Sequence, residues 1–369
     1  MSDFRRNSEG RWSPIVCDRA PKLIPAEPYR IGILEGEGIG PEVSKAALTV
    51  LAAVDNGGPS RFQIRTLVGE EVEDVVGECR TLFAEGGALL AGPKGGRFVY
   101  ELRRRLDLYC KLSPIAGCPE LRGACRLPDG TSNVDILVVR ENTMGLYQGR
   151  SAEKVAPKDG RVVQHSFCYT ERAVRRILSA AAGIARHRRK MLSVVVKQGG
   201  LPALSRLWAD CAEECAAEND VGYSLVDVDF AGYQLMRHPA EMDVIVAPNL
   251  FGDILSDLGG VLVGSRGLTF GGSFGSTQGA VYQTNHGAAH DLAGTDRANP
   301  GGHILALAML LRESFGLFDE AARIESALRR VWASGWRTAD LAEDGCRIAG
   351  TRQLGSLTAA ALVEVRETP

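Results

Sequence analysis

The 369-residue sequence lacks the apolar runs and the charge excess that would place it in several large protein classes. No run reaches the roughly 18 apolar residues that cross a bilayer. The first 29 residues carry charges but no apolar core of a secretory signal, so a cytoplasmic protein is expected. Lys and Arg number 43 against 45 Asp and Glu, for a formal net charge of −2. This balance argues against nucleic acid and membrane surfaces as partners.

Paired cysteine motifs are also absent. The nine cysteines form no CxxC pair, and their odd number argues against a disulfide framework or a zinc ribbon. Cys211 and Cys215 are four residues apart, a spacing that can hold a metal, but no histidine lies near them. They are interpreted as buried thiols.

Standard nucleotide-binding motifs are missing as well. The segment GEGIGPE (36–42) lies between a predicted strand and a predicted helix, as a phosphate-binding turn would. Its glycines fall at 36, 38 and 40, which does not match GxGxxG, and no GxxxxGK[ST] is present. By its spacing alone this segment is an ordinary turn.

What is present is a regular alternation of apolar strands and amphipathic helices. Strands are predicted at 30–36, 62–68, 88–92, 134–142, 191–198, 223–230 and 242–248. Helices are predicted at 41–54, 98–106, 170–189, 201–219, from about 250, and at 302–316 and 319–334. The alternation indicates an α/β fold with extensive parallel strand pairing. Residues 1–29 are expected to form an irregular extension.

Two aspartates give the strongest local signal of chemistry. Asp253 and Asp257, in NLFGDILSDLGG, are four residues apart on a predicted helix, so both carboxylates project from one face. A hard divalent cation would offset their repulsion, whereas the alternative is a solvated acidic face. The apolar and glycine-rich neighbours weaken that alternative. Asp229 and Lys197 are each predicted at the end of a strand, where a sheet presents functional groups, although either could be an ordinary surface charge.

A loop of small residues at 285–300 groups His286, His290 and Asp291. A metal site is conceivable there. Alternatively, Asp291 would accept hydrogen bonds from a ribose, and its charge would favour NAD over NADP, whose 2′-phosphate it would repel.

Taken together, these segments resemble the β-decarboxylating dehydrogenases of isocitrate, homoisocitrate and 3-isopropylmalate. The likeness runs from about residue 30 to the C-terminus. It rests on GEGIGPE, LRRRLDLY (102–109), RENTMGLY (140–147), VVVKQ, VDVDFAGYQL, NLFGDILSD and HGAAHDLAGTDRANP, which follow one another in the family's order.

The resemblance implies a two-domain fold of the isopropylmalate/isocitrate dehydrogenase type. A large cofactor-binding domain would comprise 30–110 and 266–369, and a smaller domain, 111–265, would carry substrate residues and the dimer interface. The family implies a homodimer in which each active site borrows residues from the partner, here at the positions of Lys197 and Asp229.

The resemblance also implies roles for individual residues. Asp229, Asp253 and Asp257 would hold Mg²⁺ or Mn²⁺, Lys197 would provide the path for the hydroxyl proton, and Tyr147 would protonate C3 of the substrate. The substrate would be bound by Arg97, Arg103, Lys111, Ser113 and Arg140. NAD would be bound by His286, Gly287, Ala288, Asp291 and Asn299.

The match departs from the family in the substrate pocket. KLSP (111–114) stands where the family has Asn-Leu-Arg-Pro, so Ser113 replaces an arginine and Lys111 is expected to compensate in part. Arg97 and Tyr100 hint at a polar or anionic 3-substituent. Isocitrate, homoisocitrate, 3-isopropylmalate and a specialised analogue such as a phosphonate all remain open as substrates. A non-catalytic regulatory subunit of such a dehydrogenase is the alternative function, and a metal-dependent hydrolase is disfavoured because no phosphate cradle is present.

Overall fold

The computed structural model describes residues 11–17, 27–55, 58–69, 71–125, 133–277 and 279–363. A ten-stranded sheet runs through these residues in the order β2-β1-β3-β12-β11-β4-β5-β10-β8-β9. Its strands are β1 (Tyr29–Leu34), β2 (Phe62–Thr66), β3 (Ala88–Ala91), β4 (Cys110–Ala116), β5 (Asp135–Glu141), β8 (Met191–Val196), β9 (Gly222–Asp227), β10 (Val244–Ala247), β11 (Phe270–Phe274) and β12 (Ala280–Thr284). The predicted α/β class is confirmed.

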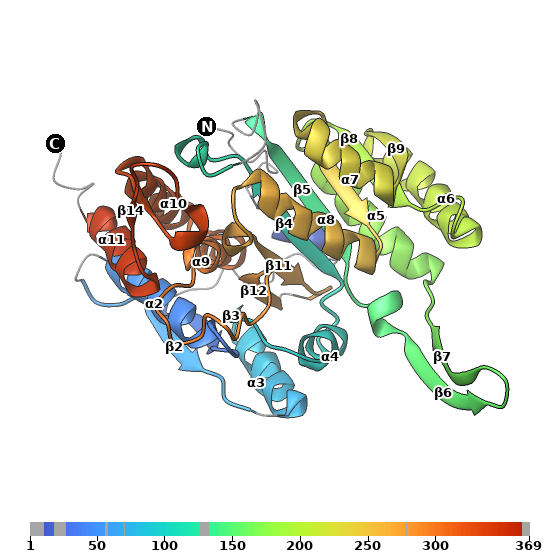
Figure 1. The fold of residues 1–369 in the computed structure, drawn as a ribbon, viewed down its shortest axis with the longest axis horizontal. Helices are drawn as coiled ribbons and strands as arrows, with labels where there is room; N and C mark the ends of the chain where they lie inside the picture. Colours follow the sequence, from blue (N-terminus) through green and yellow to red (C-terminus); the bar gives the residue numbers. More distant parts are fainter. Residues whose placement is uncertain are drawn as a thin grey trace.

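Helices cover both faces of this sheet (Figure 1). They are α1 (Ser13–Val16), α2 (Gly40–Val54), α3 (Val72–Ala84), α4 (Phe98–Arg105), α5 (Glu171–Arg186), α6 (Pro202–Asn219), α7 (Val228–Arg237), α8 (Asn249–Leu262), α9 (Gly301–Phe315), α10 (Phe318–Ala333) and α11 (Thr351–Val363). No helix of the described ranges is both long enough and apolar enough to span a membrane.

Strand direction changes along the sheet. The two flanks are parallel, as the sequence predicts, whereas β5, β4, β11 and β12 form an antiparallel centre. The strands on one side of this centre, β1, β2 and β3, come from the N-terminal part of the chain, and those on the other side come from the middle of the chain. The domain boundaries near 110 and 265 remain a prediction, since strands from both sides of them join in one sheet.

Four features were not predicted. A hairpin of β6 (Arg150–Ala156) and β7 (Gly160–Ser166) extends away from the body (Figure 1). β11 and β12 and the last helix, α11, were also missed, together with a two-stranded pair of β13 (Trp336–Arg337) and β14 (Arg347–Ile348). The predicted strand 223–230 is too long, because β9 ends at Asp227 and α7 begins at the next residue.

The core differs between the two faces of the sheet. On one face, a single buried cluster extends from β1 to β8 and includes residues of α2, α5, α6, α9 and α10. On the other face there are two clusters: one joins α3 and α4 to β1, β3 and β12, and one joins α7 and α8 to β5, β8 and β10. Apolar packing on that second face is therefore interrupted near the centre of the sheet.

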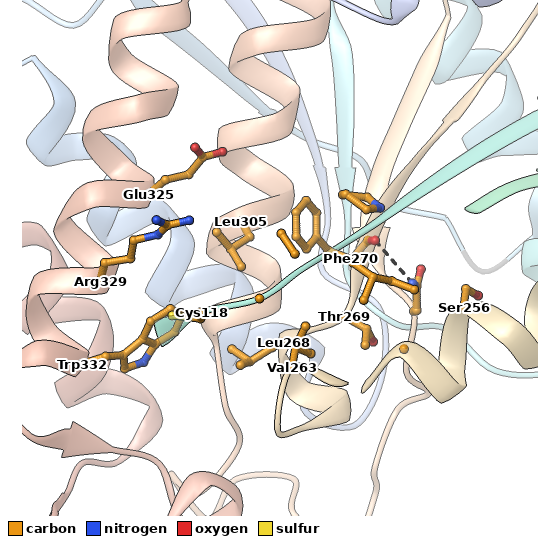
Figure 2. A pocket seen from close by; sticks show the side chains of 16 residues that line it. Cys118, Ser256, Val263, Leu268, Thr269, Phe270, Leu305, Glu325, Arg329 and Trp332 are labelled. Atoms are coloured by element: carbon orange, nitrogen blue, oxygen red, sulfur yellow. Dashed lines mark hydrogen bonds between the residues drawn. The ribbon is translucent and has the colours of Figure 1, made fainter. Parts of the chain in front are cut away.

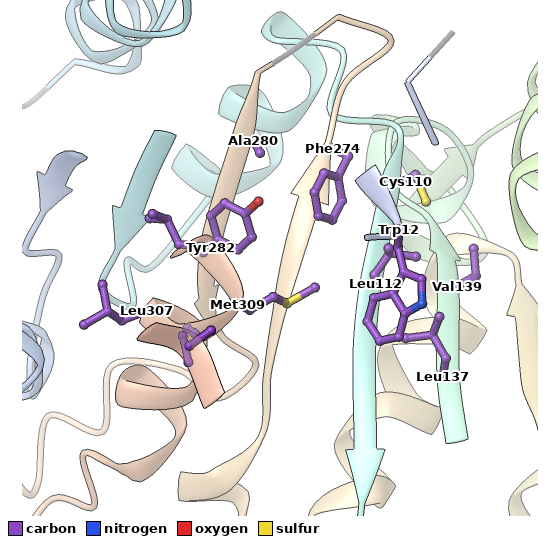
Figure 3. Close-up of a cluster of buried hydrophobic side chains, with 14 of the residues drawn as sticks. Trp12, Cys110, Leu112, Leu137, Val139, Phe274, Ala280, Tyr282, Leu307 and Met309 are labelled. Carbon is purple, nitrogen blue, oxygen red and sulfur yellow. The ribbon is translucent and has the colours of Figure 1, made fainter. Parts of the chain in front are cut away.

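Part of the N-terminal extension is built into the continuous core. Trp12 and Val16, which flank or belong to α1, are fully buried. Figure 3 shows Trp12 beside Leu112 of β4 and Leu137 of β5. The buried Glu313 of α9 accepts hydrogen bonds from the backbone N–H groups of Trp12 and Ser13, at 2.7 and 3.0 Å.

A further hydrogen bond runs from the Tyr109 hydroxyl to the Val16 carbonyl, at 2.5 Å. Residues 11–17 thus join α9, from the chain-end part, to β4 and β5. The expectation of an irregular extension is wrong for this piece, and residues 1–10 and 18–26 lie outside the described ranges.

Replacing Trp12 with alanine should lower the free energy of unfolding by about 3–5 kcal/mol, because the cavity left behind removes both transfer energy and packing contacts. Chemical denaturation would measure this loss. Trp336→Ala is the matched control, since Trp336 is only half-buried and stacks under Arg347. Equal losses for the two variants would contradict a core role for residues 11–17.

His303 of α9 gives the fold a pH dependence. Its ring is fully buried, with Nε2 3.3 Å from the Ser44 hydroxyl, and burial lowers the pKa of His303 from 6.5 to about 3. The unfolded chain therefore binds the proton first as pH falls. The stabilisation is complete above pH 6.5 and is lost progressively toward pH 3.

When the pH falls from 7 to 5, protonation of this histidine in the unfolded chain should lower the free energy of unfolding by about 2 kcal/mol. Denaturation curves at the two pH values should show a smaller difference for His303→Gln than for the wild type. An undiminished difference in the variant would assign the pH dependence to other groups.

Candidate active site

The interruption in the core is filled by charged and polar side chains of the central strands. On β4, Cys110 and Leu112 belong to the continuous cluster, so the alternating residues Lys111 and Ser113 face the other side of the sheet. Arg140 of β5 likewise alternates with Val139 of that cluster. All three polar residues are buried. The two strands thus place buried charge in the gap between the two apolar clusters on that face of the sheet.

Arg140 connects the sheet to α8. Its Nε and one terminal nitrogen donate to the Oδ1 atom of Asn249, at 3.0 and 2.7 Å, and its other terminal nitrogen is paired with Asp253. The Tyr147 hydroxyl donates to the second oxygen of Asp253 at 2.9 Å. Burial opposes ionisation of Asp253, but Arg140 and Lys111 hold its pKa below the ordinary value. Asp253 is therefore a carboxylate at neutral pH.

Two further cations in this cluster have no counter-ion of their own. Neither Arg103 nor Lys111 makes a hydrogen bond or ion pair with its side chain to any described residue, and the Arg103 Nε is buried without a partner. Burial, together with Arg140, lowers the pKa of Arg103 to about 9. Burial, Arg103 and Arg140 lower the pKa of Lys111. The cluster therefore carries positive charge that an anionic ligand would relieve.

Asp257 lies one helical turn beyond Asp253 on α8, as predicted. Its two oxygens accept from Arg266 at 3.1 and 2.7 Å. Both carboxylates remain more than a third exposed. Within the described part of one chain, no three His, Cys, Asp or Glu side chains form a group that could hold a metal. The loop residues His286, His290 and Asp291 therefore do not form one.

The third predicted metal ligand, Asp229, lies elsewhere in the same chain. It does not end a strand, since β9 stops at Asp227 and Asp229 lies in the first turn of α7. The Lys197 ammonium is 2.6 Å from Asp229 and 3.4 Å from Asp227. The hydrogen bond that Lys197 donates to Asp229 raises the pKa of Lys197 and lowers the pKa of Asp229. These two predicted residues form an exposed ion pair separate from the cluster around Asp253.

The remaining residues predicted at the substrate pocket differ in their surroundings. Arg97 is exposed and donates to the Tyr147 carbonyl at 2.8 Å. The Tyr100 ring lies 5.1 Å from that of Tyr147 and under the Arg103 guanidinium. Ser113 is buried, where it accepts from the Asn285 side chain at 3.3 Å. Arg97 and Tyr100 thus lie at the edge of the cluster, and Ser113 is buried on β4 two residues after Lys111.

A pocket with a volume of about 590 Å³ is lined by most of the predicted cofactor residues. Its lining includes His286, Gly287, Asp291 and Asn299, and also Asp340. The His286 Nε2 is buried without a partner among the described residues, and burial lowers the pKa of His286, which keeps the ring neutral. Asn299 donates to Asp340 at 3.0 Å. An unpaired imidazole nitrogen beside two carboxylates suits the hydroxyls and amides of a nucleotide.

Ala288 does not line the pocket, and its contacts instead hold the loop in place. Its carbonyl accepts from the Ile39 backbone N–H at 2.9 Å and lies against Gly38, where a Cβ would collide with it. Gly38 also has a positive φ of 59°. The glycine turn at 36–42 is thus held against the 285–300 loop, which the sequence spacing does not show.

Three residues of these sites were not predicted. Asn249, which orients Arg140, stands four residues before Asp253 and could have been found from the helical spacing of NLFGDILSD. Arg266 and Asp340 come from segments without a distinctive pattern, so no sequence signal pointed to them.

The comparisons with known proteins agree with this geometry. Residues 30–357 match a family model described as isocitrate/isopropylmalate dehydrogenase. The chain is 40% identical to a 3-isopropylmalate dehydrogenase of Nitratidesulfovibrio vulgaris, over 89% of this chain and 98% of that protein. It is 38% identical to one from Geobacillus kaustophilus, over 88% and 93%.

Among solved structures, an isocitrate dehydrogenase from Methylococcus capsulatus matches with a TM-score of 0.79 and 31% identity, over 91% of this chain and 99% of that one. The family match covers most of the chain and begins beyond the N-terminal segment. The chain belongs to the isocitrate/isopropylmalate dehydrogenase family.

Proposed function

We propose that this protein is a metal- and NAD-dependent dehydrogenase that oxidises and decarboxylates a 3-substituted malate. The observation that carries the proposal is the cluster of buried cations Arg103, Lys111 and Arg140 beside the carboxylates of α8. Arg103 and Lys111 have no counter-ion among the described residues, and a ligand with several carboxylates would supply the missing negative charge. Arg103 and Arg140 would each hold a substrate carboxylate, and Lys111 would supply charge in place of the arginine lost at Ser113.

The α8 carboxylates fit a hard divalent cation such as Mg²⁺ or Mn²⁺. Asp253 and Asp257 offer oxygen ligands from one helix face, and both are accessible. The third ligand would be the partner subunit's Asp229. The bound ion would act as a Lewis acid that lowers the pKa of the substrate's 2-hydroxyl. Arg140 and Tyr147 occupy both oxygens of Asp253 in the single chain, so their contacts would rearrange when the ion binds.

The 590 Å³ pocket fits NAD. Asp291 would accept from the adenosine ribose and repel a 2′-phosphate, and the unpaired His286 nitrogen and Asn299 would face the adenosine. Gly287 leaves open space for the pyrophosphate, while Ala288 fixes the loop against Gly38. NAD would accept the hydride released from C2 of the substrate.

Two side chains of this protein would move protons. Burial and the Asp253 charge raise the pKa of Tyr147, so its phenol stays protonated and suits the acid that delivers a proton to C3 after decarboxylation. Lys197 would take the hydroxyl proton. Because Asp229 holds the pKa of Lys197 high in its own chain, Lys197 becomes a base only after this ion pair is broken. The Lys197–Asp229 ion pair would break when Asp229 binds the metal held by the partner subunit.

This arrangement supports a homodimer with shared active sites. Large apolar side chains stay exposed on α7 and α8, with Phe230 53% and Tyr233 59% accessible, accompanied by Ile254 and Val261. These helices also carry Asp229 and both aspartates of the metal site. Burying this surface against a second copy would bring each Lys197–Asp229 pair toward the partner's cluster.

The charge of the cluster bears on the substrate. Within the described residues, Asp253 is paired with Arg140 and Asp257 is paired with Arg266, so neither carboxylate neutralises Arg103 or Lys111, and a divalent ion would add further positive charge. A malate whose 3-substituent carries its own anionic group, as in isocitrate, homoisocitrate or a phosphonate, balances this charge better than one with an isopropyl group. The exposed Arg97 guanidinium at the border of the cluster supports the same choice.

The first test is NADH formation, followed by absorbance at 340 nm, with Mg²⁺ or Mn²⁺ and a panel of isocitrate, homoisocitrate, 3-isopropylmalate, malate and phosphonomethylmalate. One substrate should turn over in a metal-dependent manner. Asp253→Asn should reduce kcat/KM by about 10³-fold or more, since it removes a charged metal ligand. Asp210→Asn, on the surface of α6, is the control and should keep full activity.

Binding of the panel without turnover would instead support a regulatory subunit. Turnover that needs neither metal nor NAD would contradict the proposal.

Mixed dimers test the sharing of sites. Asp253→Asn and Asp229→Asn should each be inactive alone. After the two variants are unfolded together and refolded at equal concentration, about a quarter of wild-type activity should return, because half the dimers are hybrids with one intact site. If each site used residues of a single chain, mixing would restore nothing.

A further inference from the structure

A smaller cavity, of about 70 Å³, is lined in part by α8 but by none of the residues assigned to substrate, metal or cofactor. It is formed where the end of β4, α8 and the start of β11 meet α9 and α10 (Figure 2). Most of its wall is apolar and comes from Ile115, Val263, Leu268, Phe270 and Leu305. It has about half the volume of an apolar cavity that holds benzene, which suits a tail of about three carbons.

The α10 side of this cavity carries a cation without a counter-ion. Figure 2 shows the Arg329 side chain extending from α10 toward Leu305. Among the described residues, Arg329 makes no hydrogen bond or ion pair. The neighbouring Glu325 is already neutralised, because both its oxygens accept from Arg312, at 2.6 and 2.9 Å. The buried Nε1 of Trp332, also in the lining, has no partner within the described ranges either.

The sheet side of the cavity has the opposite character. Asn285 donates through its amide nitrogen to the Ser113 hydroxyl and the Phe270 carbonyl, both at 3.3 Å, and its buried Oδ1 has no partner in the described structure. An acceptor oxygen repels an anion. A carboxylate in this cavity would therefore lie at the Arg329 end, with its apolar tail between Leu268, Phe270 and Leu305.

We infer that this cavity is a second ligand site, for a short aliphatic monocarboxylate whose charged group pairs with Arg329. The site goes beyond the proposed function, since none of the residues assigned to substrate, metal or NAD lines it. It contacts the active site through α8, because the cavity residue Ser256 donates to the Asp253 carbonyl at 2.9 Å. A ligand in this cavity would therefore contact the helix that carries both proposed metal ligands, Asp253 and Asp257.

Butyrate is the probe, and saturation-transfer NMR on the full-length protein is the measurement. Butyrate should bind saturably, with the strongest transfer at its methyl group, and uncharged butyramide should bind at least about tenfold more weakly. Arg329→Gln should weaken butyrate binding by a similar factor. Arg80→Gln, which removes a surface arginine of α3 outside the lining, should leave it unchanged.

Two further arms locate the site. Leu305→Phe should fill the cavity and abolish butyrate binding while the protein keeps its melting temperature. Saturating 3-isopropylmalate or isocitrate with Mg²⁺ should not displace butyrate. Displacement would place the ligand in the substrate site, and equal binding of butyramide, or unchanged binding by Arg329→Gln or Leu305→Phe, would overturn the proposal.

Discussion

The contact of Arg140 with Asn249 and Asp253 is the interaction on which the site depends. Arg140 lies on a central strand with its side chain buried, where an unpaired guanidinium would be costly. Its pairing fixes α8 to β5, and Gly252 permits the close approach because a Cβ there would press on the Arg140 side chain. One ion pair thereby both satisfies a buried charge and sets the position of the helix that carries Asp253 and Asp257.

The asymmetry of the core explains why this charge is tolerated. Continuous apolar packing on one face of the sheet, reinforced by Trp12 and Val16, joins the strands from β1 to β8 across the centre of the sheet. The other face can therefore leave a gap for Lys111, Ser113 and Arg140. Alternation along β4 and β5 accomplishes this, since each strand gives one set of side chains to the core and the other to the site.

The sequence predicts what depends on local periodicity and little of what depends on tertiary contact. The strand at 62–66 follows from its alternating apolar and polar residues, and the strand at 88–91 follows from a short apolar run. The placement of Asp253 and Asp257 on one helix face follows from their spacing of four residues. The prediction that Asp229 ends a strand is wrong, because β9 passes directly into α7 without a turn residue. The pattern of apolar residues therefore continues across the boundary and does not mark the end of the strand. The docking of residues 11–17 has no local signature, since the Glu313 side chain that binds Trp12 is 301 residues away in the sequence.

The Lys197–Asp229 pair shows why a single chain is an incomplete catalyst in the proposed scheme. The pair is neutral and solvated, so it costs the free chain little. Moving both side chains to a partner's cluster would add no net charge there, yet Asp229 would meet a cation and Lys197 would lose the carboxylate that keeps it protonated. Assembly would then convert a stable surface ion pair into a metal ligand and a base, and the free monomer would hold neither in an active form.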